Sequence, residues 1–274
     1  VWFGYNIYKL VEENNLLITE RIRGLVLIRE QNEFRFNSFT FLLNPSIVKS
    51  ATKFKLLNLV LIKPENFERR LLIRHTWAVN TNITKTVFVC GLAKHGAVNS
   101  LLKYESAQFN DIVQVDFDDH YFNLTLKTMI AFKWVSMHFE TNQLDFVLKI
   151  DDDVVVDMKK LLFKIQSNFD SKQLMLFCYK IAGVSPIRDR GSKFYISESE
   201  YAGNLFPDYC AGSAYMLSHS LVKKIGSLNR FRDYIKFEDV YITGILREHF
   251  GGKITSFNSN YTITASQYST KELV

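Results

Sequence analysis

The stretch Phe146–Asp157, FVLKIDDDVVVD, places three consecutive aspartates between two apolar runs. These flanks indicate a buried strand that ends in carboxylates, rather than an acidic loop tip in solvent. Adjacent carboxylates repel one another, so the arrangement costs free energy unless a cation or hydrogen-bond donors lie nearby. The stretch therefore predicts a functional site at the end of a strand. The plainer alternative is a solvated acidic turn.

Apolar runs alternate with segments of helical spacing along the rest of the chain. The predicted strands are 56–62, 86–90, 112–117 and 146–150, and the predicted helices are 65–77, 97–109, 124–139 and 158–169, the last with Asp157 as N-cap. This alternation predicts an α/β fold with a mostly parallel central sheet and helices on both faces. Ligands of such sheets bind beyond the carboxyl ends of the strands, where Asp151, Asp152 and Asp153 fall.

The composition is that of a packed globular protein, with 47% hydrophobic and 23% charged residues in 274. We expect one large domain over 51–274, preceded by a stem-like segment over 1–50. The formal net charge is +6, but the basic residues are scattered and form no stripe, which argues against nucleic acid as a partner. No apolar run reaches the roughly 18 residues that a membrane-spanning helix needs.

The 3 cysteines form no C-x-x-C pair, which argues against a structural zinc site. Cys90 and Cys178 lie in apolar runs and are interpreted as small core residues. Three N-x-T sequons, at Asn82, Asn123 and Asn260, favour a lumenal compartment weakly, because such triplets are common by chance.

The triple aspartate does not fit a calcium-binding EF-hand. Counted from Asp151, positions 6 and 12 hold Val156 and Leu162, where such a loop needs Gly and Glu. Hard divalent cations such as Mg²⁺ and Mn²⁺ instead take one or two carboxylates and complete their shell with substrate phosphates. The sequence therefore favours half of a clamp for a metal ion and a diphosphate.

Other segments offer partners for this chemistry, each with a plainer alternative. Arg70 and Arg74 share one helical face and could bind phosphate, although a solvated face is the commoner use of such residues. Glu238 and Asp239 precede a predicted helix, where they could cap it or act as a general base. The small residues within 206–218 (FPDYCAGSAYMLS) by themselves predict a turn.

Taken together, these segments resemble the family 31 glycosyltransferases, the β-1,3-galactosyltransferases and β-1,3-N-acetylglucosaminyltransferases of the Golgi. The matching segments occur in the family's order. They are ENFERRLLIRHTW, QVDFDDHYFNLTLKT, FVLKIDDDVVVDM, SPIRDRGSKFYISESEY with FPDYCAGSAYMLS, and KFEDVYITGI. Each motif alone is weak, but five in register over roughly 41–252 are specific.

The resemblance implies a GT-A type, Rossmann-like fold with a DxD motif that binds a divalent metal and a UDP-sugar. Asp153 then corresponds to the direct ligand of Mn²⁺ or Mg²⁺, and Asp239 to the catalytic base, with Glu238 as the fallback. The remaining predicted contacts fall into three groups: Asp151 and Asp152 at the metal and ribose; Arg70, Arg74, Thr76 and Trp77 on the donor side; and Tyr209, Gly212 and Ser213 at the sugar.

The activity that the resemblance implies is inverting transfer of a hexose from UDP-galactose or UDP-N-acetylglucosamine to the 3-hydroxyl of a glycan on protein or lipid. The implied location is the Golgi lumen, with a type II membrane anchor that this chain does not contain. Two departures motivate an alternative, a catalytically inactive relative that binds a sugar or a partner. His249 comes too early and no His follows it, and the sequence stops at Val274, short of the family's usual end. As a separate departure, the usual cysteine partner of Cys210 is missing from 137–146. A metal-dependent phosphohydrolase is a more distant alternative.

Overall fold

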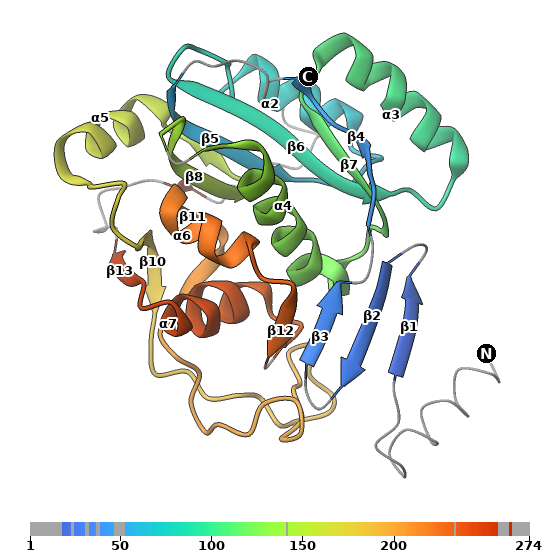
Figure 1. The fold of residues 1–274 in the computed structure, drawn as a ribbon, viewed down its shortest axis with the longest axis vertical. Helices are drawn as coiled ribbons and strands as arrows, with labels where there is room; N and C mark the ends of the chain where they lie inside the picture. The colour runs from blue at the N-terminus through green and yellow to red at the C-terminus, as the bar shows by residue number, and fades with distance from the viewer. Residues whose placement is uncertain are drawn as a thin grey trace.

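The computed structural model describes residues 18–22, 25–30, 33–36, 39–46, 53–140, 142–232, 234–256 and 263–264. An eight-stranded sheet forms the centre of the molecule, in the order β13-β10-β11-β8-β5-β6-β7-β4 (Figure 1). Its strands are β4 (Phe41–Leu43), β5 (Phe54–Leu61), β6 (Thr84–Leu92), β7 (Ile112–Asp118), β8 (Leu144–Asp151), β10 (Met175–Ile181), β11 (Tyr209–Ser218) and β13 (Lys253–Ser256).

The predicted α/β architecture is confirmed. Strands β8, β5, β6 and β7 are parallel neighbours, as is the pair β10 and β13. The prediction of a turn within 206–218 is wrong, because most of that segment is β11, which pairs antiparallel with both β8 and β10. Small residues at its start hid the alternation of a strand, whereas the segment from Ala214 to Leu217 is buried in the core. Asp151 therefore ends β8 between a parallel and an antiparallel neighbour.

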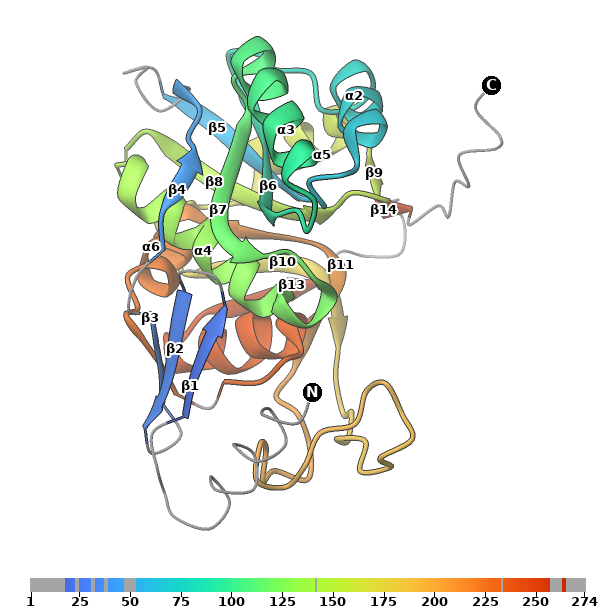
Figure 2. The same cartoon turned by 90° about the vertical axis from the view of Figure 1, so that its right-hand side faces the viewer.

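Helices cover both faces of the sheet (Figure 2). Helices α2 (Phe67–His75), α3 (Gly96–Phe109) and α5 (Met158–Asn168) lie on one face, and α4 (Leu124–His138) and α6 (His219–Gly226) on the other. The short elements are η2 (Tyr121–Asn123), the π-helical η3 (Val240–Leu246) and α7 (Arg247–His249). Asp157 caps α5 as predicted, its carboxylate accepting from the Lys160 amide at 3.0 Å.

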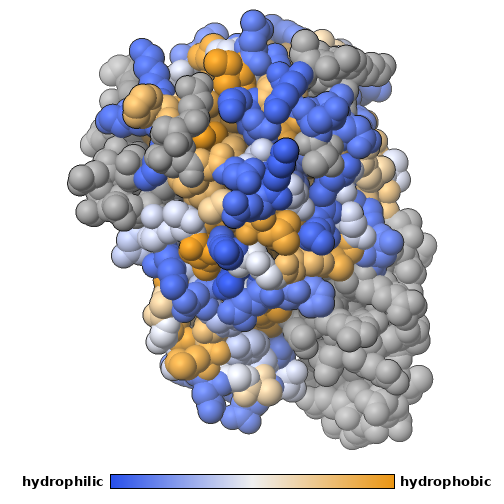
Figure 3. Space-filling view, turned by 60° about the vertical axis from the view of Figure 1, so that its left-hand side comes forward, coloured by the Kyte–Doolittle hydropathy of each residue, from blue (hydrophilic) through white to orange (hydrophobic). Residues whose placement is uncertain are grey.

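Strand β5 shows why the sheet has two cores. Its even-numbered residues Leu56 and Val60 pack towards α2, α3 and α5, and its odd-numbered residues Leu57, Leu59 and Leu61 pack towards α4 and α6. Both sets are almost completely buried, as expected for a central strand of a sheet that is covered on both sides. On the face of the molecule shown in Figure 3, hydrophobic residues gather in patches separated by hydrophilic ones.

Two small sheets complete the fold. One is antiparallel, in the order β1-β2-β3-β12 (Ile18–Ile22, Leu25–Glu30, Glu33–Phe36 and Arg230–Arg232), and the other pairs β9 (Val155–Val156) with β14 (Ile263–Thr264). Strands before residue 50 therefore pair with strands after it, since β3 pairs with β12 and β4 with β7. The division into a stem-like segment and a domain at residue 50 stays a prediction. Among the described residues, no helix combines the length and the apolar character that a membrane crossing requires.

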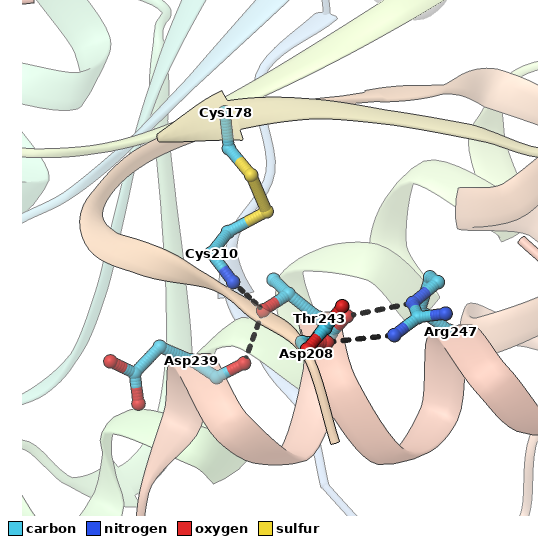
Figure 4. The surroundings of a disulfide bond; sticks show 6 residues. All are labelled: Cys178, Asp208, Cys210, Asp239, Thr243 and Arg247. Carbon is cyan, nitrogen blue, oxygen red and sulfur yellow. Dashed lines mark hydrogen bonds between the residues drawn. A yellow bond between two sulfur atoms is a disulfide. The ribbon is translucent and has the colours of Figure 1, made fainter. Parts of the chain in front are cut away.

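A disulfide between Cys178 and Cys210 joins β10 to β11 (Figure 4). The interpretation of Cys178 as a plain core residue is thus wrong, and Cys210 has a partner on a neighbouring strand in place of the one missing from 137–146. The sequence concealed the pair because the two cysteines lie 32 residues apart and meet only when β11 folds back along β10. Cys90 is buried, as predicted, and it is a free cysteine.

His219 at the start of α6 makes the fold sensitive to acid. The side chain is 1% exposed, neither ring nitrogen has a hydrogen-bond partner, and burial lowers its pKa to about 4. Between pH 6.5 and 4, His219 therefore binds a proton in the unfolded chain but not in the folded protein. The free energy of unfolding is highest above pH 6.5 and falls as the pH drops towards 4. Between pH 7 and 4.5, the free energy of unfolding of the wild type should fall by roughly 2 kcal/mol more than that of His219→Leu, as measured by urea unfolding at both pH values. The exposed His95→Gln variant should behave as wild type, and equal pH slopes for His219→Leu and wild type would contradict the assignment.

Candidate active site

A cleft of about 390 Å³ opens at the carboxyl end of β8. Its walls come from η2, the long connection between β10 and β11, the start of β11, and the residues around the start of η3. Several predicted site residues line it together: Asp151, Tyr209, Gly212, Ser213, Glu238 and Asp239. Residues distant in the sequence thus converge at the strand end where the sequence placed a site.

The side chain of Lys149 links three of the residues that line the cleft. Its side chain is fully buried in β8, and its Nζ donates to Asp151 Oδ1 at 2.7 Å and to the Gly212 carbonyl at 2.6 Å. Glu238 Oε2 lies 3.6 Å from the same nitrogen. Burial lowers the pKa of Lys149, but Asp151 and Glu238 outweigh it, so the pKa is raised and the group is cationic. Sequence reasoning missed Lys149, although a lysine inside an apolar strand next to aspartates signals a buried ion pair.

The carboxylate of Asp151 lies among other acids. Burial raises its pKa, Lys149 offsets part of the rise, and Asp153 and Asp152 add to it. Asp152 accepts from Asn66 Nδ2 at 2.8 Å and lies 3.5 Å from an Arg69 nitrogen, whereas Asp153 is exposed. Clustered carboxylates of this kind favour a nearby cation.

Glu238 and Asp239 occupy different environments. Glu238 is 3% exposed, accepts a hydrogen bond from the Tyr215 hydroxyl, and has its pKa raised to about 7 by burial. Asp239 caps η3 by accepting from the Val240 amide at 2.8 Å, and burial raises its pKa as well. A Cβ on Gly212 would lie 3.3 Å from the Asp239 Cβ and 3.4 Å from its Oδ2, so a larger residue at 212 would crowd this carboxylate.

The backbone of Asp239 is tied to the disulfide strand (Figure 4). The Cys210 amide donates to Thr243 Oγ1 at 2.8 Å, and the Thr243 hydroxyl in turn donates to the Asp239 carbonyl. In Figure 4 the Asp239 carboxylate points away from Thr243, and Asp239 lines the cleft. Asp239 is therefore fixed through its main chain while its side-chain oxygens face the cleft.

The donor set is compatible with a divalent metal. In the described part of the chain, no cluster of three or more His, Cys, Asp or Glu side chains is arranged to hold an ion alone. Mg²⁺ and Mn²⁺ need only one or two carboxylates when substrate phosphates supply further ligands. Asp151, which faces the cleft, and the exposed Asp153 meet that requirement in chemical type, and their role as ligands stays a prediction.

The predicted donor-side residues on α2 do not line the cleft. Arg70 is 1% exposed and donates to Glu105 at 2.8 and 2.6 Å and to the carbonyls of Lys63 and Pro64. Arg74 binds Asp111 with two hydrogen bonds of 2.8 Å and Glu105 with one of 2.7 Å. Both guanidinium groups therefore join α2 to α3, and Arg74 also joins α2 to the residue before β7.

The two residues that end the α2 motif also have local roles. The Thr76 hydroxyl donates to the Leu72 carbonyl at 2.8 Å, and Trp77 is half-buried against the core beneath α2. The donor-binding role of Arg70, Arg74, Thr76 and Trp77 stays a prediction for which the structure shows no contact with the cleft.

Removing the Arg70 guanidinium tests this structural role. In Arg70→Met we expect the free energy of unfolding to fall by about 3–5 kcal/mol, because Glu105 keeps a buried charge with one partner fewer. Arg69→Met is the matched control on the same helix. Its pair with Asp152 at 3.5 Å is partly exposed and should be worth less than about 1 kcal/mol. Urea unfolding measures both, and equal stability of the two variants would rule out the structural role.

Comparison with known proteins places this geometry in a family. Residues 68–257 match the family model described as Galactosyltransferase. The chain belongs to this galactosyltransferase family. The matched range contains every predicted site residue, and the recognition of the family from its motifs is confirmed.

Curated members of the galactosyltransferase family align with most of the chain. Beta-1,3-galactosyltransferase 1 of Homo sapiens and of Mus musculus is 30% identical over 217 residues, 77% of this chain and 66% of the relative. Beta-1,3-galactosyltransferase 5 of Pan paniscus is 30% identical over 243 residues, 87% of this chain and 79% of the relative. The chain thus spans just under two thirds of the length of the first of these relatives.

Two solved structures are distantly similar to this galactosyltransferase-family chain. The galactosyltransferase LgtC in complex with donor and acceptor sugar analogs has a TM-score of 0.39 at 12% identity, covering 74% of this chain and 73% of LgtC. TarS 1–349 of S. aureus has a TM-score of 0.41 at 13% identity, covering 76% of this chain and 59% of TarS.

Proposed function

We propose that this galactosyltransferase-family chain is an enzyme that transfers a hexose, galactose or N-acetylglucosamine, from a UDP-sugar to the 3-hydroxyl of an acceptor glycan, forming a β-1,3 linkage. The observation that carries the proposal is the convergence of Asp151, Glu238 and Asp239 on one cleft, with Lys149 beneath them. The names of the aligned relatives, beta-1,3-galactosyltransferases, support the reaction type and the linkage.

Asp239 is the proposed general base. Its carboxylate takes the proton of the acceptor 3-hydroxyl while that oxygen attacks the anomeric carbon of the donor. The bond between the anomeric carbon and the diphosphate oxygen breaks, the electron pair leaves with UDP, and the configuration at the carbon inverts. Burial, which raises the pKa of Asp239, brings a carboxylate closer to the pKa that a base needs near neutral pH.

The other acidic residues have supporting roles in the proposal. Asp153 and Asp151 would hold Mn²⁺ or Mg²⁺, which supplies positive charge against the diphosphate when bound. Tyr209, Gly212 and Ser213 line the cleft next to the proposed base, where a donor or acceptor sugar can lie. Glu238 is less suited to act as base, because Tyr215 and Lys149 already engage its carboxylate.

A donor screen tests the proposal. The protein is incubated with UDP-galactose or UDP-N-acetylglucosamine, saccharide acceptors with a free 3-hydroxyl, and Mn²⁺, Mg²⁺ or a chelator, and released UDP and product linkage are measured. Acceptor-dependent UDP release with a β-1,3 product, lost in the chelator and in Asp153→Ala, is expected. UDP binding without transfer across the acceptors would overturn it in favour of an inactive sugar-binding relative, which the shared cleft of base and acidic residues does not favour.

We also propose that the protein works in the lumen of the Golgi, held to the membrane as a type II protein. The Cys178–Cys210 disulfide supports an oxidising compartment of the secretory pathway. Asn82, the first residue of a sequon, is exposed between α2 and β6 and open to glycosylation.

The sequons give a direct prediction for a secreted form of the protein. Asn82→Gln should remove one N-glycan, read as the loss of one step in gel mobility on treatment with a glycan-cleaving amidase. Asn123→Gln should leave the glycan count unchanged, because Asn123 is 7% exposed and its Nδ2 donates to the Asp118 carbonyl at 2.9 Å. A glycan on Asn123, or none on Asn82, would contradict the assignment. Asn260 lies outside the described residues.

A further inference from the structure

A row of aromatic rings lines the cleft. The ring centroids of Phe194 and Phe237 lie 6.4 Å apart, those of Phe237 and Phe206 6.3 Å, and those of Phe206 and Tyr209 6.4 Å. Phe194 is 44% exposed at the outer end. At the inner end burial raises the pKa of Tyr209, and the neighbouring Asp239 adds to the rise. The row therefore leads from solvent to the proposed base.

Two lysines flank the outer end of this row. The Nζ of Lys193 lies 4.7 Å from the ring centroid of Phe194, and that of Lys236 lies 5.6 Å from the centroid of Phe237. The two rings contact each other, and both lysines line the same cleft. Within the described residues, neither ammonium group has a carboxylate within 4 Å. The charges of Lys193 and Lys236 are thus not neutralised by the protein, unlike that of Lys149.

The loop over 182–208 that carries Lys193 and Phe194 is preformed (the long gold connection at the foot of Figure 2). The Arg188 guanidinium links distant parts of the loop, because it donates to the carbonyls of Ile196 at 2.8 Å, Tyr201 at 2.7 Å and Gly203 at 3.2 Å. A β-bridge between Ile187 and Tyr195 closes the segment on either side of Lys193. A ligand here does not have to order the loop, and the entropy cost of binding is correspondingly small.

From this geometry we infer that the outer end of the cleft binds an acceptor saccharide that carries a negative charge, a sulfate or a carboxylate. The apolar face of the sugar lies on Phe194 and Phe237, and its anion lies between Lys193 and Lys236. The inference rests on the proposed function, because it takes Asp239 at the inner end of the row as the base that meets the acceptor hydroxyl. Donor phosphates belong near Asp151, and three ring contacts lead from Phe194 to Tyr209.

Matched acceptors test the inference. A galactose-terminated disaccharide, its 6-O-sulfate and the corresponding 6-carboxylate share a free 3-hydroxyl and differ only in charge. We expect the KM of each charged acceptor to be roughly tenfold below that of the neutral one, as two partly exposed ion pairs permit. The advantage should shrink as salt is raised. In the double variant Lys193→Met/Lys236→Met it should disappear, while the exposed Lys172→Met keeps it.

Two further measurements separate the explanations. If the double variant raises the KM of the UDP-sugar and not that of the acceptor, the lysines bind donor phosphate and the inference is overturned. Equal KM values for charged and neutral acceptors in the wild type also overturn it. Calorimetric binding of the sulfated and neutral disaccharides needs no turnover, so it decides for or against the subsite even if UDP release fails and the proposed function falls.

Discussion

Replacing Asp239 with asparagine is expected to lower the rate of sugar transfer by about 10²–10⁴-fold, the usual contribution of a general base. Asparagine has the same shape and cannot accept the proton of the acceptor hydroxyl. Its side-chain oxygen can still accept from the Val240 amide, which is 2.8 Å away in the native protein, so the start of η3 is preserved. We therefore expect kcat to fall while the KM of the UDP-sugar and the unfolding midpoint stay close to the wild-type values.

Asp208→Asn is the matched control for this prediction. Asp208 lies just before β11, and its side chain, 44% exposed, pairs with Lys180 at 2.6 Å. Its loss should leave transfer unchanged. If Asp239→Asn keeps transfer within a few-fold of wild type while Glu238→Gln abolishes it, the base is Glu238 and the assignment is reversed. Initial rates of UDP release at saturating donor decide the matter.

Replacing Lys149 with methionine is expected to lower the free energy of unfolding by about 3–5 kcal/mol, because it leaves the buried Glu238 and the partly exposed Asp151 without their cation. Methionine keeps most of the side-chain volume, so the loss reports on charge rather than on a cavity. The Gly212 carbonyl also loses its 2.6 Å donor. Adding Glu238→Gln removes one of the stranded charges and should restore part of the stability. Urea unfolding of the single and double variants measures both effects.

The control for Lys149 is Lys159→Met, at an exposed position on α5 shortly after the aspartates, which should unfold as wild type does. Lys149→Arg should also be destabilised, because a larger guanidinium does not fit the fully buried position. If Lys149→Met is as stable as Lys159→Met, the lysine is not the element that holds β8, Glu238 and Gly212 together.

The fold was predictable where the chain's local pattern decides the structure. The strands over 56–62, 86–90, 112–117 and 146–150 were placed by continuous apolar runs, and Asp157 by its position before a helical stripe. Strand β11 was not predictable, because its first residues are small and its identity depends on pairing with both β8 and β10. Cys178 and Cys210 were hidden for the same reason.

The sequence predicted which residue types form the candidate site, but less well which partners each side chain binds. Spacing placed Arg70 and Arg74 on one face of a helix, and both indeed reach Glu105. A guanidinium group binds carboxylate and phosphate with the same geometry, so the sequence alone does not say which one it meets. The pairing of Lys149 with Asp151 had a local signal, whereas its bond to the Gly212 carbonyl, 63 residues away, did not.

The disulfide has a consequence for how this protein can be re-engineered or diversified. Cys178 and Cys210 bracket the 182–208 loop, and beyond it Arg247 donates to the Asp208 carbonyl at 2.7 Å. Both feet of the loop are thus anchored to the sheet independently of what lies between them. A loop with other exposed residues can be grafted between the same feet without moving Asp239, provided that it keeps Ile196 and Phe206, which are buried in the core. The exposed surface of the 182–208 loop can therefore change, in evolution or by design, while the position of the proposed base Asp239 stays the same.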